Sequence, residues 1–408
     1  MVVSKPLITS KTILNSEVVI VGAGLVGLTA AIALSRLGKQ VVLTDAQALP
    51  AFSLGWIEDT AHWDTRIYAL TNETVHWLTE IGVWQHVPAN RVNAMAAMHL
   101  WSPTDVHSKP SLSLDAADAH LTQMGFIVES QALLYACWQV LASTDVTIIT
   151  DAPAQVLQHA GHKVQLTLPQ HEIEAQLLLG ADGGRSWVRD QCGVNVTTVD
   201  FEQTALVTNY IAERPHGNIA RQWFGAHETL ALLPLPQQQV SLVWALSQDQ
   251  ASVKQNLSPE ALAAEVEQRC GYALGKLTPA GAVLGFPLVQ KTAETMALPS
   301  VLLLGDAAHQ VHPMAGQGVN LGFQDVQALC RELGNLSALR PLGDASFLRH
   351  VMRTRQLDIL KMHTLTRGLD KLFSRPEPAW THAAILGLRG VENSAMLKRF
   401  LIRTATQG

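Results

Sequence analysis

The chain has 408 residues, of which 48% are hydrophobic and 15% charged. Its length exceeds what one hydrophobic core usually holds, so about two domains are expected. A net charge of −5 provides no surface field that would favour nucleic acid as a partner. The cysteines lie far apart without a CxxC pair, which argues against a disulfide framework or a zinc site and favours buried thiols in a reducing cytoplasm; they are Cys137, Cys192, Cys270 and Cys330.

The beginning of the chain predicts a βαβ unit after a polar leader over residues 1–16. An apolar strand over 17–21 precedes a helix over 25–37 that Gly38 ends, and a second apolar strand covers 40–44. Continuous apolar runs are typical of parallel strands that are buried on both faces. Residues 18–34 carry no charge, but this run is shorter than the roughly 20 residues of a spanning helix. We therefore interpret it as a buried strand, a turn and a buried helix.

The turn inside this unit carries the motif GxGxxG, in the residues GAGLVG from 22 to 27. Gly22 permits a tight turn, Gly24 lets a pyrophosphate approach the backbone, and Gly27 allows the helix to pack closely on the strand. The free N–H groups at the helix start favour phosphates. Asp45 follows Gly27 by 18 residues, near the spacing of about 20 expected of a ribose-binding acid. The pattern predicts a dinucleotide site and leaves NAD and FAD open.

Further along, the period of the apolar residues changes between helix and strand. Helical spacing covers 73–81 and 130–142, and residues 147–179 alternate as a short antiparallel meander does. More strand-like runs, cut by prolines, extend over 204–244, and SPEALAAEVEQRC from 258 begins as a capped helix. Residues 336–408 are expected to be largely helical and are more basic. The elements together predict a parallel nucleotide-binding domain, a mostly antiparallel sheet and a helical tail.

Two smaller features admit a functional and a structural interpretation. Asp182, in GADGGRS, follows an apolar strand and accepts donors either from a ligand or from an ordinary Asp-Gly turn, and Ser186 can cap the next helix without any ligand. Arg66, in HWDTRIYAL, offers a forked donor to a phosphate or a ring oxygen, or is simply solvated.

The segment LLLGDAAHQVHPMAGQGVNLGFQDV, from residue 302, joins an apolar strand to a glycine-led helix. His309 and His312 have no further His, Cys or Glu placed with them, so a metal site is not expected. No GxSxG elbow supports a nucleophilic triad. Glycines before a helix leave N–H groups free at its positive end, a surface that suits a flat ring gaining negative charge. The sequence identifies no general base.

Three segments together resemble one known family: GAGLVG, GADGGRSWVR and GDAAHQVHPMAGQGVNLGFQDV. With WDTRIYAL, GFIVES and the tail FLRHVMRTRQLDILKMHTLTRGLDKLF, they are similar, in order and over nearly the whole chain, to the FAD-dependent aromatic hydroxylases of the para-hydroxybenzoate hydroxylase class. The resemblance is closer to the ubiquinone-biosynthesis branch, the UbiH/UbiF/VisC/Coq6 family. One departure is Asp45, where the family more often has glutamate.

The resemblance implies an α/β fold in which a Rossmann-like FAD-binding domain is interrupted by a mostly antiparallel β-sheet substrate domain and followed by a helical C-terminal region. The implied FAD-binding domain is discontinuous, over residues 16–75, 125–190 and 285–335. The substrate domain would take residues 76–124 and 191–284, and the helical region residues 336–408.

The resemblance also implies FAD contacts position by position. The pyrophosphate and adenosine would be held by Gly22, Ala23, Gly24, Gly27, Asp45, Val156 and Asp182. The ribityl chain and the flavin ring would be held by Asp306, Pro313, Ala315, Gly316, Gln317, Gly318, Val319 and Asn320. Arg66 would reach the FAD from its loop. Val156 would act through its backbone on adenine, and Asp182 would also touch the transient reductant. His309 and His312 would be mostly structural, unless a free ring nitrogen faces the flavin pocket.

In such enzymes NAD(P)H reduces FAD and leaves, and O₂ then forms a flavin C4a-hydroperoxide that hydroxylates an electron-rich ring. The implied substrate is a polyprenylated phenol of ubiquinone biosynthesis. Two alternatives stay open: an FAD-dependent oxidase or dehydrogenase of another small aromatic, and a non-catalytic flavin-binding subunit of a lipid-biosynthesis complex. The expected location is the cytoplasm. The basic and apolar stretch LKRFLIR, from 397, is consistent with peripheral contact to the inner membrane, with packing on its own domain, or with another ubiquinone-biosynthesis protein as partner.

Overall fold

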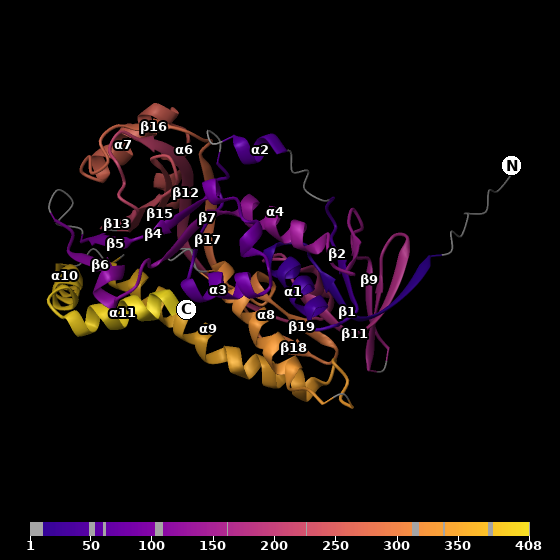
Figure 1. Cartoon of the computed structure of the whole chain (residues 1–408). Coiled ribbons are helices and arrows are strands. Elements are labelled where there is room, and N and C mark those ends of the chain that lie inside the picture. Colours follow the sequence, from indigo (N-terminus) through magenta and orange to yellow (C-terminus); the bar gives the residue numbers. More distant parts are fainter. Residues whose placement is uncertain are drawn as a thin grey trace.

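The computed structural model describes residues 11–48, 54–59, 63–102, 109–160, 162–225, 227–311, 318–337, 339–373 and 378–407. Within them, apolar runs that come mostly from the first half of the chain form a largely parallel sheet (Figure 1). Its strand order is β18 (Ala297–Leu298), β19 (Val301–Leu303), β11 (His171–Gly180), β1 (Thr12–Val21), β2 (Val41–Thr44) and β8 (Thr147–Ile149).

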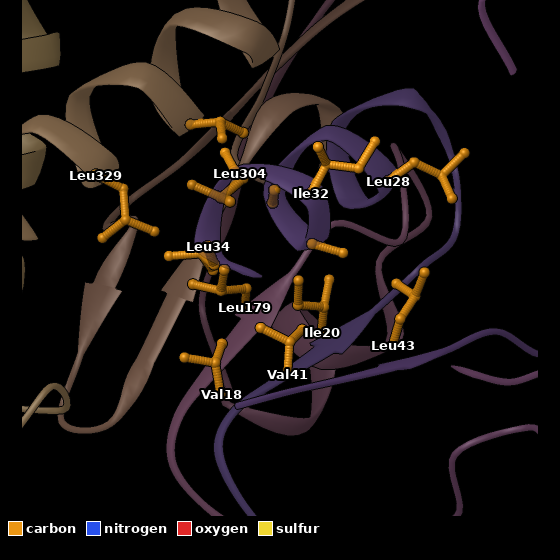
Figure 2. Close-up of a cluster of buried hydrophobic side chains, with 14 of the residues drawn as sticks. Val18, Ile20, Leu28, Ile32, Leu34, Val41, Leu43, Leu179, Leu304 and Leu329 are labelled. Atoms are coloured by element: carbon orange, nitrogen blue, oxygen red, sulfur yellow. The ribbon is translucent and has the colours of Figure 1, made fainter. Parts of the chain in front are cut away.

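Helix α1 (Leu25–Arg36) covers one face of this sheet. Its side chains Leu28, Ile32 and Leu34 are fully buried and belong to the same hydrophobic cluster as the strand residues Ile20 and Leu43 (Figure 2). The helix ends where Gly38 adopts a φ of +73°, as the sequence predicted. The membrane-like run is thus the buried strand, turn and helix of a globular core, and no described helix is long and apolar enough to cross a membrane.

Two expectations about the parallel sheet were wrong in detail. Residues 12–16 belong to β1 and are not a leader, because β11 offers them parallel partners from His171 onward. The run at 147–149 is not part of the meander, because it pairs in parallel with β2 as strand β8. The antiparallel part consists of β9 (Val156–Ala160) and β10 (Lys163–Thr167), which pairs with the start of β11.

A second, mostly antiparallel sheet forms the other half of the molecule. Its order is β20 (His309–Gln310), β17 (Leu284–Ala293), β12 (Val196–Ala212), β15 (Gln239–Ser247), β14 (Glu228–Pro234), β13 (Ile219–Gly225), β5 (Ala97–Trp101) and β6 (Leu112–Asp115), with β16 (Leu277–Pro279) beside β12. Strand β17 extends this sheet past residue 285, the predicted start of the third FAD-binding segment; the domain boundaries themselves stay a prediction. A three-stranded sheet lies between the halves: β3 (Ile67–Leu70), β7 (Gly125–Glu129) and β4 (Val92–Met95).

The remaining helices pack on these sheets. Those of the first half are α2 (Leu54–Glu58), α3 (Asn72–Glu80), α4 (Ser130–Leu141) and α5 (Trp187–Gln191). Helices α6 (Gln248–Gln255) and α7 (Pro259–Arg269) cover one face of the larger sheet, where Ala251 and Leu262 enter its core. Ser258 caps α7 through the N–H of Ala261, as its sequence predicted.

Helix α8 (Gly318–Gly334) follows the third glycine-containing segment. The described part of residues 336–408 is largely helical, as expected, and contains α9 (Ala345–Phe373), α10 (Pro378–Glu392) and α11 (Ala395–Gln407). Helix α9 runs along one side of the molecule from the edge of the parallel sheet to α10, and α11 lies near β6 (Figure 1). Leu388 of α10 and Ile402 of α11 are buried in the same cluster as Met95 and Leu112. The tail therefore closes the outer side of the core beside the larger sheet.

Candidate active site

The first two glycine-containing turns touch through their backbones. A Cβ on Gly22, whose φ is +109°, would lie 2.4 Å from the carbonyl oxygen of Ala181. The N–H of Ala181 in turn donates to the carbonyl of Val21 at 2.8 Å. A Cβ on Gly27 would lie 1.8 Å from the oxygen of Gly22. Residues with a side chain at 22 or 27 would force these elements apart.

The third turn joins the same place through one side chain. Val26, inside GAGLVG, packs against Gly305 and Gly322, where added Cβ atoms would lie 3.1 Å and 2.5 Å from its Cγ2. The N–H of Leu304 donates to Gly180 at 2.9 Å, next to the second turn. The three segments singled out in the sequence therefore meet at the carboxyl-terminal edge of the parallel sheet, where ligands of open α/β sheets bind.

A cavity of about 590 Å³ opens at this edge. The predicted residues that line it are Gly24, Arg66, Asp306, Gly318 and Val319, and Ala181 and Gly183 line it on either side of Asp182. An added Cβ on Gly24 would meet no atom within 4 Å. Space is therefore open above this backbone, as the approach of a pyrophosphate requires.

Asp45 orders the first turn as well as ending its strand. Its carboxylate accepts the N–H of Ala23 at 2.6 Å and that of Gln47 at 2.7 Å. The backbone N–H groups of Asp151 and Ala152 donate to the carbonyls of Gln47 and Asp45. The loop after β8 thus lies beside Asp45, where an adenosine would sit if this acid holds its ribose.

Val156 follows this loop in the sequence. It begins β9, pairs through Thr167 with Glu172 of β11, and is not among the residues that line the cavity. Its side chain is 40% exposed. The adenine contact through its backbone stays a prediction.

Asp182 makes at least one structural contact within the protein. Its Oδ2 accepts the N–H of Val188 in the first turn of α5 at 3.0 Å, while Ser186 caps the same helix through the N–H of Arg189. Its other oxygen, Oδ1, is buried and has no hydrogen-bond partner among the described residues. The capping interpretation of this motif therefore holds for one oxygen, and a contact of Asp182 with FAD or the reductant stays a prediction.

A polar corner surrounds Asp306 inside the cavity. Solvent reaches its carboxylate through the cavity, while protein elsewhere desolvates it; this raises the pKa of Asp306 more than His309 and Arg66 lower it. Tyr68 and Ser130 line the same corner. Burial raises the pKa of the Tyr68 phenol more than Ser130 and Arg66 lower it, so the phenol stays protonated at neutral pH. Neither Tyr68 nor Ser130 was singled out as a site residue, although each belongs to a segment of the family resemblance, WDTRIYAL and GFIVES.

The loop that carries Arg66 is fastened from behind. Glu129, fully buried, accepts the N–H of Asp64 at 2.9 Å, and Asp64 accepts the N–H of Arg66 at 3.0 Å. Arg91, also fully buried, lies 3.2 Å from the Glu129 carboxylate. Burial raises the pKa of Glu129 to about 7, although the Asp64 N–H and Arg91 lower it. These contacts fix the backbone of Arg66 and leave its side chain exposed to the cavity.

A buried charge cluster holds the third turn. His309 Nε2 lies 2.6 Å from Asp325 Oδ2, which also accepts the N–H of Gly305 at 3.0 Å. Arg355 of α9 donates to the other oxygen of Asp325 at 3.0 Å. Burial lowers the pKa of His309, but the charge of Asp325 and its hydrogen bond outweigh this, so the net shift is upward. Nδ1 of His309 is buried without a partner among the described residues, and His309 does not line the cavity, which supports the structural interpretation of this residue.

The glycine-led helix α8 presents Gly318 and Val319 to the cavity. Asn320 is buried, and its side chain donates to the carbonyl of Ala69 at 2.8 Å, so it braces β3. A flavin contact through its backbone stays a prediction. The other positions predicted here lie outside the described residues: His312, Pro313, Ala315, Gly316 and Gln317. Within the described ranges, no three His, Cys, Asp or Glu side chains gather as metal ligands.

The cavity continues from this polar corner onto the larger sheet. Its lining there is almost entirely aliphatic or aromatic and includes Met98, Val207, Leu233, Val243, Phe286 and Leu288. These side chains come from five different strands, so no single sequence motif marks the wall. One space therefore joins the cradle, formed by the turns at Gly24, Gly183 and Asp306, to an apolar chamber on the larger sheet.

Comparison with known proteins agrees with this geometry. The model of the family described as FAD binding domain matches residues 15–346. The chain is 32% identical to 3-demethoxyubiquinol 3-hydroxylase of Escherichia coli, covering 96% of this chain and 98% of that protein. It is also 32% identical to the ubiquinone hydroxylase UbiL of Rhodospirillum rubrum, covering 96% and 89%.

Among solved structures, p-nitrophenol 4-monooxygenase PnpA of Pseudomonas putida has the same fold, with a TM-score of 0.77 at 17% identity over 97% of this chain and 99% of that one. PqsL of Pseudomonas aeruginosa, described as a probable FAD-dependent monooxygenase, gives 0.72 at 18% identity over 91% and 100%. The predicted fold class is thereby confirmed.

The two glycines of the first turn predict opposite phenotypes. Gly24→Val fills open space, so FAD affinity should fall at least about tenfold, while the free energy of unfolding of the FAD-free protein changes little. Gly27→Ala should destabilise the FAD-free protein by about 1–3 kcal/mol or more, because its Cβ meets the Gly22 carbonyl. Flavin absorbance after dialysis and urea unfolding measure the two effects. Tight FAD binding by Gly24→Val would show that the phosphate does not pass over this residue.

The His309–Asp325 pair predicts a pH-dependent stability. The folded state raises the pKa of His309, so its stabilisation is full below the unfolded value of about 6.5 and is lost as pH rises through the folded value. His309→Gln should therefore cost about 1–3 kcal/mol at pH 6, and less at alkaline pH. Urea unfolding of both proteins from about pH 6 to pH 9 measures the difference. A difference that stays constant over this range would contradict a charged His309.

Proposed function

The chain belongs to the FAD binding domain family and is an FAD-dependent monooxygenase, and from this premise we propose that it hydroxylates the aromatic ring of a polyprenylated phenol in ubiquinone biosynthesis, with NAD(P)H and O₂. The observation that carries the proposal is the single cavity that joins the cradle at Gly24 and Asp306 to the apolar chamber. The relatives named as ubiquinone hydroxylases, which match nearly the whole chain, support it.

The cradle residues fit the cofactor. Gly24 leaves room for its pyrophosphate, Asp45 lies at the end of β2 where a ribose would be held, and Asp306 is open to the cavity next to Arg66. When bound, FAD supplies the redox chemistry that accepts reducing equivalents and activates O₂. The protein contributes binding, orientation and exclusion of water.

Helix α8 provides the electrostatic part of this contribution. It begins at Gly318, which lines the cavity together with Val319. The first N–H groups of a helix have no partner within the helix, and its dipole places partial positive charge there. A ring that gains negative charge is stabilised by such groups, and the effect is larger where the surrounding walls are apolar.

The chamber fits an apolar ring that carries a hydrocarbon tail. Leu233, Met98 and Ala220 line it and belong to, or pack against, the same core cluster as Leu388 and Ile402 of the tail helices. A prenyl chain that enters this region exchanges water for aliphatic contacts, at about 25 cal/mol for each Å² buried. The same walls keep water from the reacting atoms.

Isotope incorporation separates this function from the alternatives. With NAD(P)H, ¹⁸O₂ and a short-chain prenylphenol, the product should gain one labelled oxygen atom. An FAD-dependent oxidase or dehydrogenase would instead remove two hydrogens, and a non-catalytic flavin protein would leave the phenol unchanged. Expression in hosts that lack individual ring-hydroxylation steps, followed by analysis of quinone intermediates, assigns the ring position.

We further propose that the protein contacts the inner membrane peripherally through a patch on α10 and α11. Its members are Leu386, Arg389, Met396, Leu397, Arg399, Phe400 and Arg403, all exposed. Met396 and Phe400 are 74% and 64% exposed, whereas Ile402 on the opposite side of α11 is buried. Exposed apolar side chains among arginines complement anionic headgroups over hydrocarbon. The substrate's long prenyl tail makes such contact useful.

Vesicle sedimentation tests this patch. Phe400→Glu should reduce binding to vesicles that contain phosphatidylglycerol by about tenfold. The variant lacks the phenyl group that would enter the bilayer, and its added negative charge is repelled by the anionic headgroups. Leu357→Glu is the matched control, since Leu357 is 66% exposed on α9 outside the patch. Equal binding by both variants, or no dependence on anionic lipid, would contradict membrane contact through this patch and favour a protein partner there.

A further inference from the structure

Two glutamines of the larger sheet line the cavity, Gln222 and Gln310. Gln310 lies beside the second glycine turn, where a Cβ on Gly184 would be 2.8 Å from its Oε1, whereas Gln222 belongs to the wall of the chamber. Along β13, Ala220 and Phe224 enter the cluster beside the chamber, whereas Trp223 stacks on Trp101 on the other face, with ring centroids 4.6 Å apart. Successive side chains of a strand alternate between faces. Gln222 therefore shares the face of Ala220 and Phe224, and it lines the cavity.

Its charged neighbour does not compete for this role. Arg221 also borders the cavity, but alternation directs its side chain to the opposite face. There its Nη1 donates to the carbonyls of His216 at 2.8 Å and Ile219 at 3.0 Å. The guanidinium is thus used for holding the turn before β13. The cross-strand neighbours of Gln222, Ala231 and Leu100, are apolar.

The carboxamide of Gln222 has no hydrogen bond to any other described residue. An amide offers two donors and an acceptor, and a half-buried amide that loses water without gaining a partner costs about 1–3 kcal/mol. A hydrocarbon ring would leave this cost uncompensated. A ring that carries a hydroxyl, methoxy or carbonyl oxygen would remove it.

We propose that Gln222 is a specificity-determining residue that hydrogen-bonds a neutral oxygen substituent of the substrate ring and so sets which ring carbon faces the flavin. This inference rests on the proposed function, because it takes the chamber as the place of the aromatic ring. Among the described residues, the larger sheet directs no cationic side chain into the chamber, because the Arg221 guanidinium is held at the turn before β13, so a neutral oxygen suits the site better than a carboxylate. The flavin-side groups Arg66 and Asp306 lie at the other end of the same cavity.

Paired ligands test the proposal with the FAD-loaded protein. Dissociation constants are measured, without NAD(P)H, from the change in flavin absorbance on adding a short-chain prenylphenol or the matching prenylbenzene that lacks the oxygen. Gln222→Leu should weaken prenylphenol binding about tenfold, the loss of one hydrogen bond in an apolar site, and change prenylbenzene binding less than about twofold. Val243→Ala, which removes apolar surface from the same wall and enlarges the chamber, is the control and should weaken the binding of both ligands alike.

Each outcome decides the matter. If Gln222→Leu weakens both ligands equally, its role is packing and the assignment is overturned. If the wild type binds prenylphenol and Gln222→Leu binds it as well, the assignment also fails while the proposed function stands. If the wild type binds neither ligand, the proposed function fails and takes the assignment with it. During turnover, Gln222→Leu should also release more hydrogen peroxide per NAD(P)H consumed, because the ring is held less well.

Discussion

The close approach of the Gly22 and Ala181 backbones is the constraint on which the rest of the site depends. Two parallel strands, β1 and β11, end side by side, and their turns can touch only because position 22 has no side chain. Val26 then has a fixed place, and the third turn packs on it through Gly305 and Gly322. The cradle is therefore set by a close backbone contact and by one side chain, Val26, whose χ1 is strongly restricted because it is β-branched and lies in a helix.

Two buried clusters of charged residues support the loops that face the cavity. Asp325 gathers His309, Arg355 and the Gly305 N–H on the side of the third turn. On the side of Arg66, Glu129 and Arg91 form a second buried pair. Each cluster ties a ligand-facing loop to a helix or strand behind it. A chain with few charges thus spends several of them where desolvated ion pairs fix geometry, at the cost that removing one partner leaves a buried charge unpaired.

The cradle was predictable from the sequence because its parts are local. Three short segments carry the signal: GxGxxG between a strand and a helix, an acid at the end of the next strand, and a glycine at the start of α8. Each can be recognised from a few neighbouring residues, without knowledge of the tertiary structure. The chamber was not predictable in the same way. Its walls depend on which face each residue of five strands occupies, and this follows from register between distant strands, such as Gln222 opposite Ala231. Local patterns also mislead where pairing with a distant strand determines the structure. Residues 12–16 are polar enough for a leader, yet they form part of a strand because they pair with β11.

These two kinds of structure divide recognition between them. A rigid backbone cradle discriminates by shape and suits a cofactor that the fold keeps in one place. An apolar chamber discriminates poorly among hydrocarbons, since one methylene more or less changes the free energy of transfer by about 0.8 kcal/mol. A single uncompensated amide in such a wall discriminates more strongly, because a ligand without the matching oxygen must leave it unpaired. Under the proposed assignment, tolerance for a long tail and selectivity for the ring arise in the same chamber, from its many apolar side chains and from the carboxamide of Gln222.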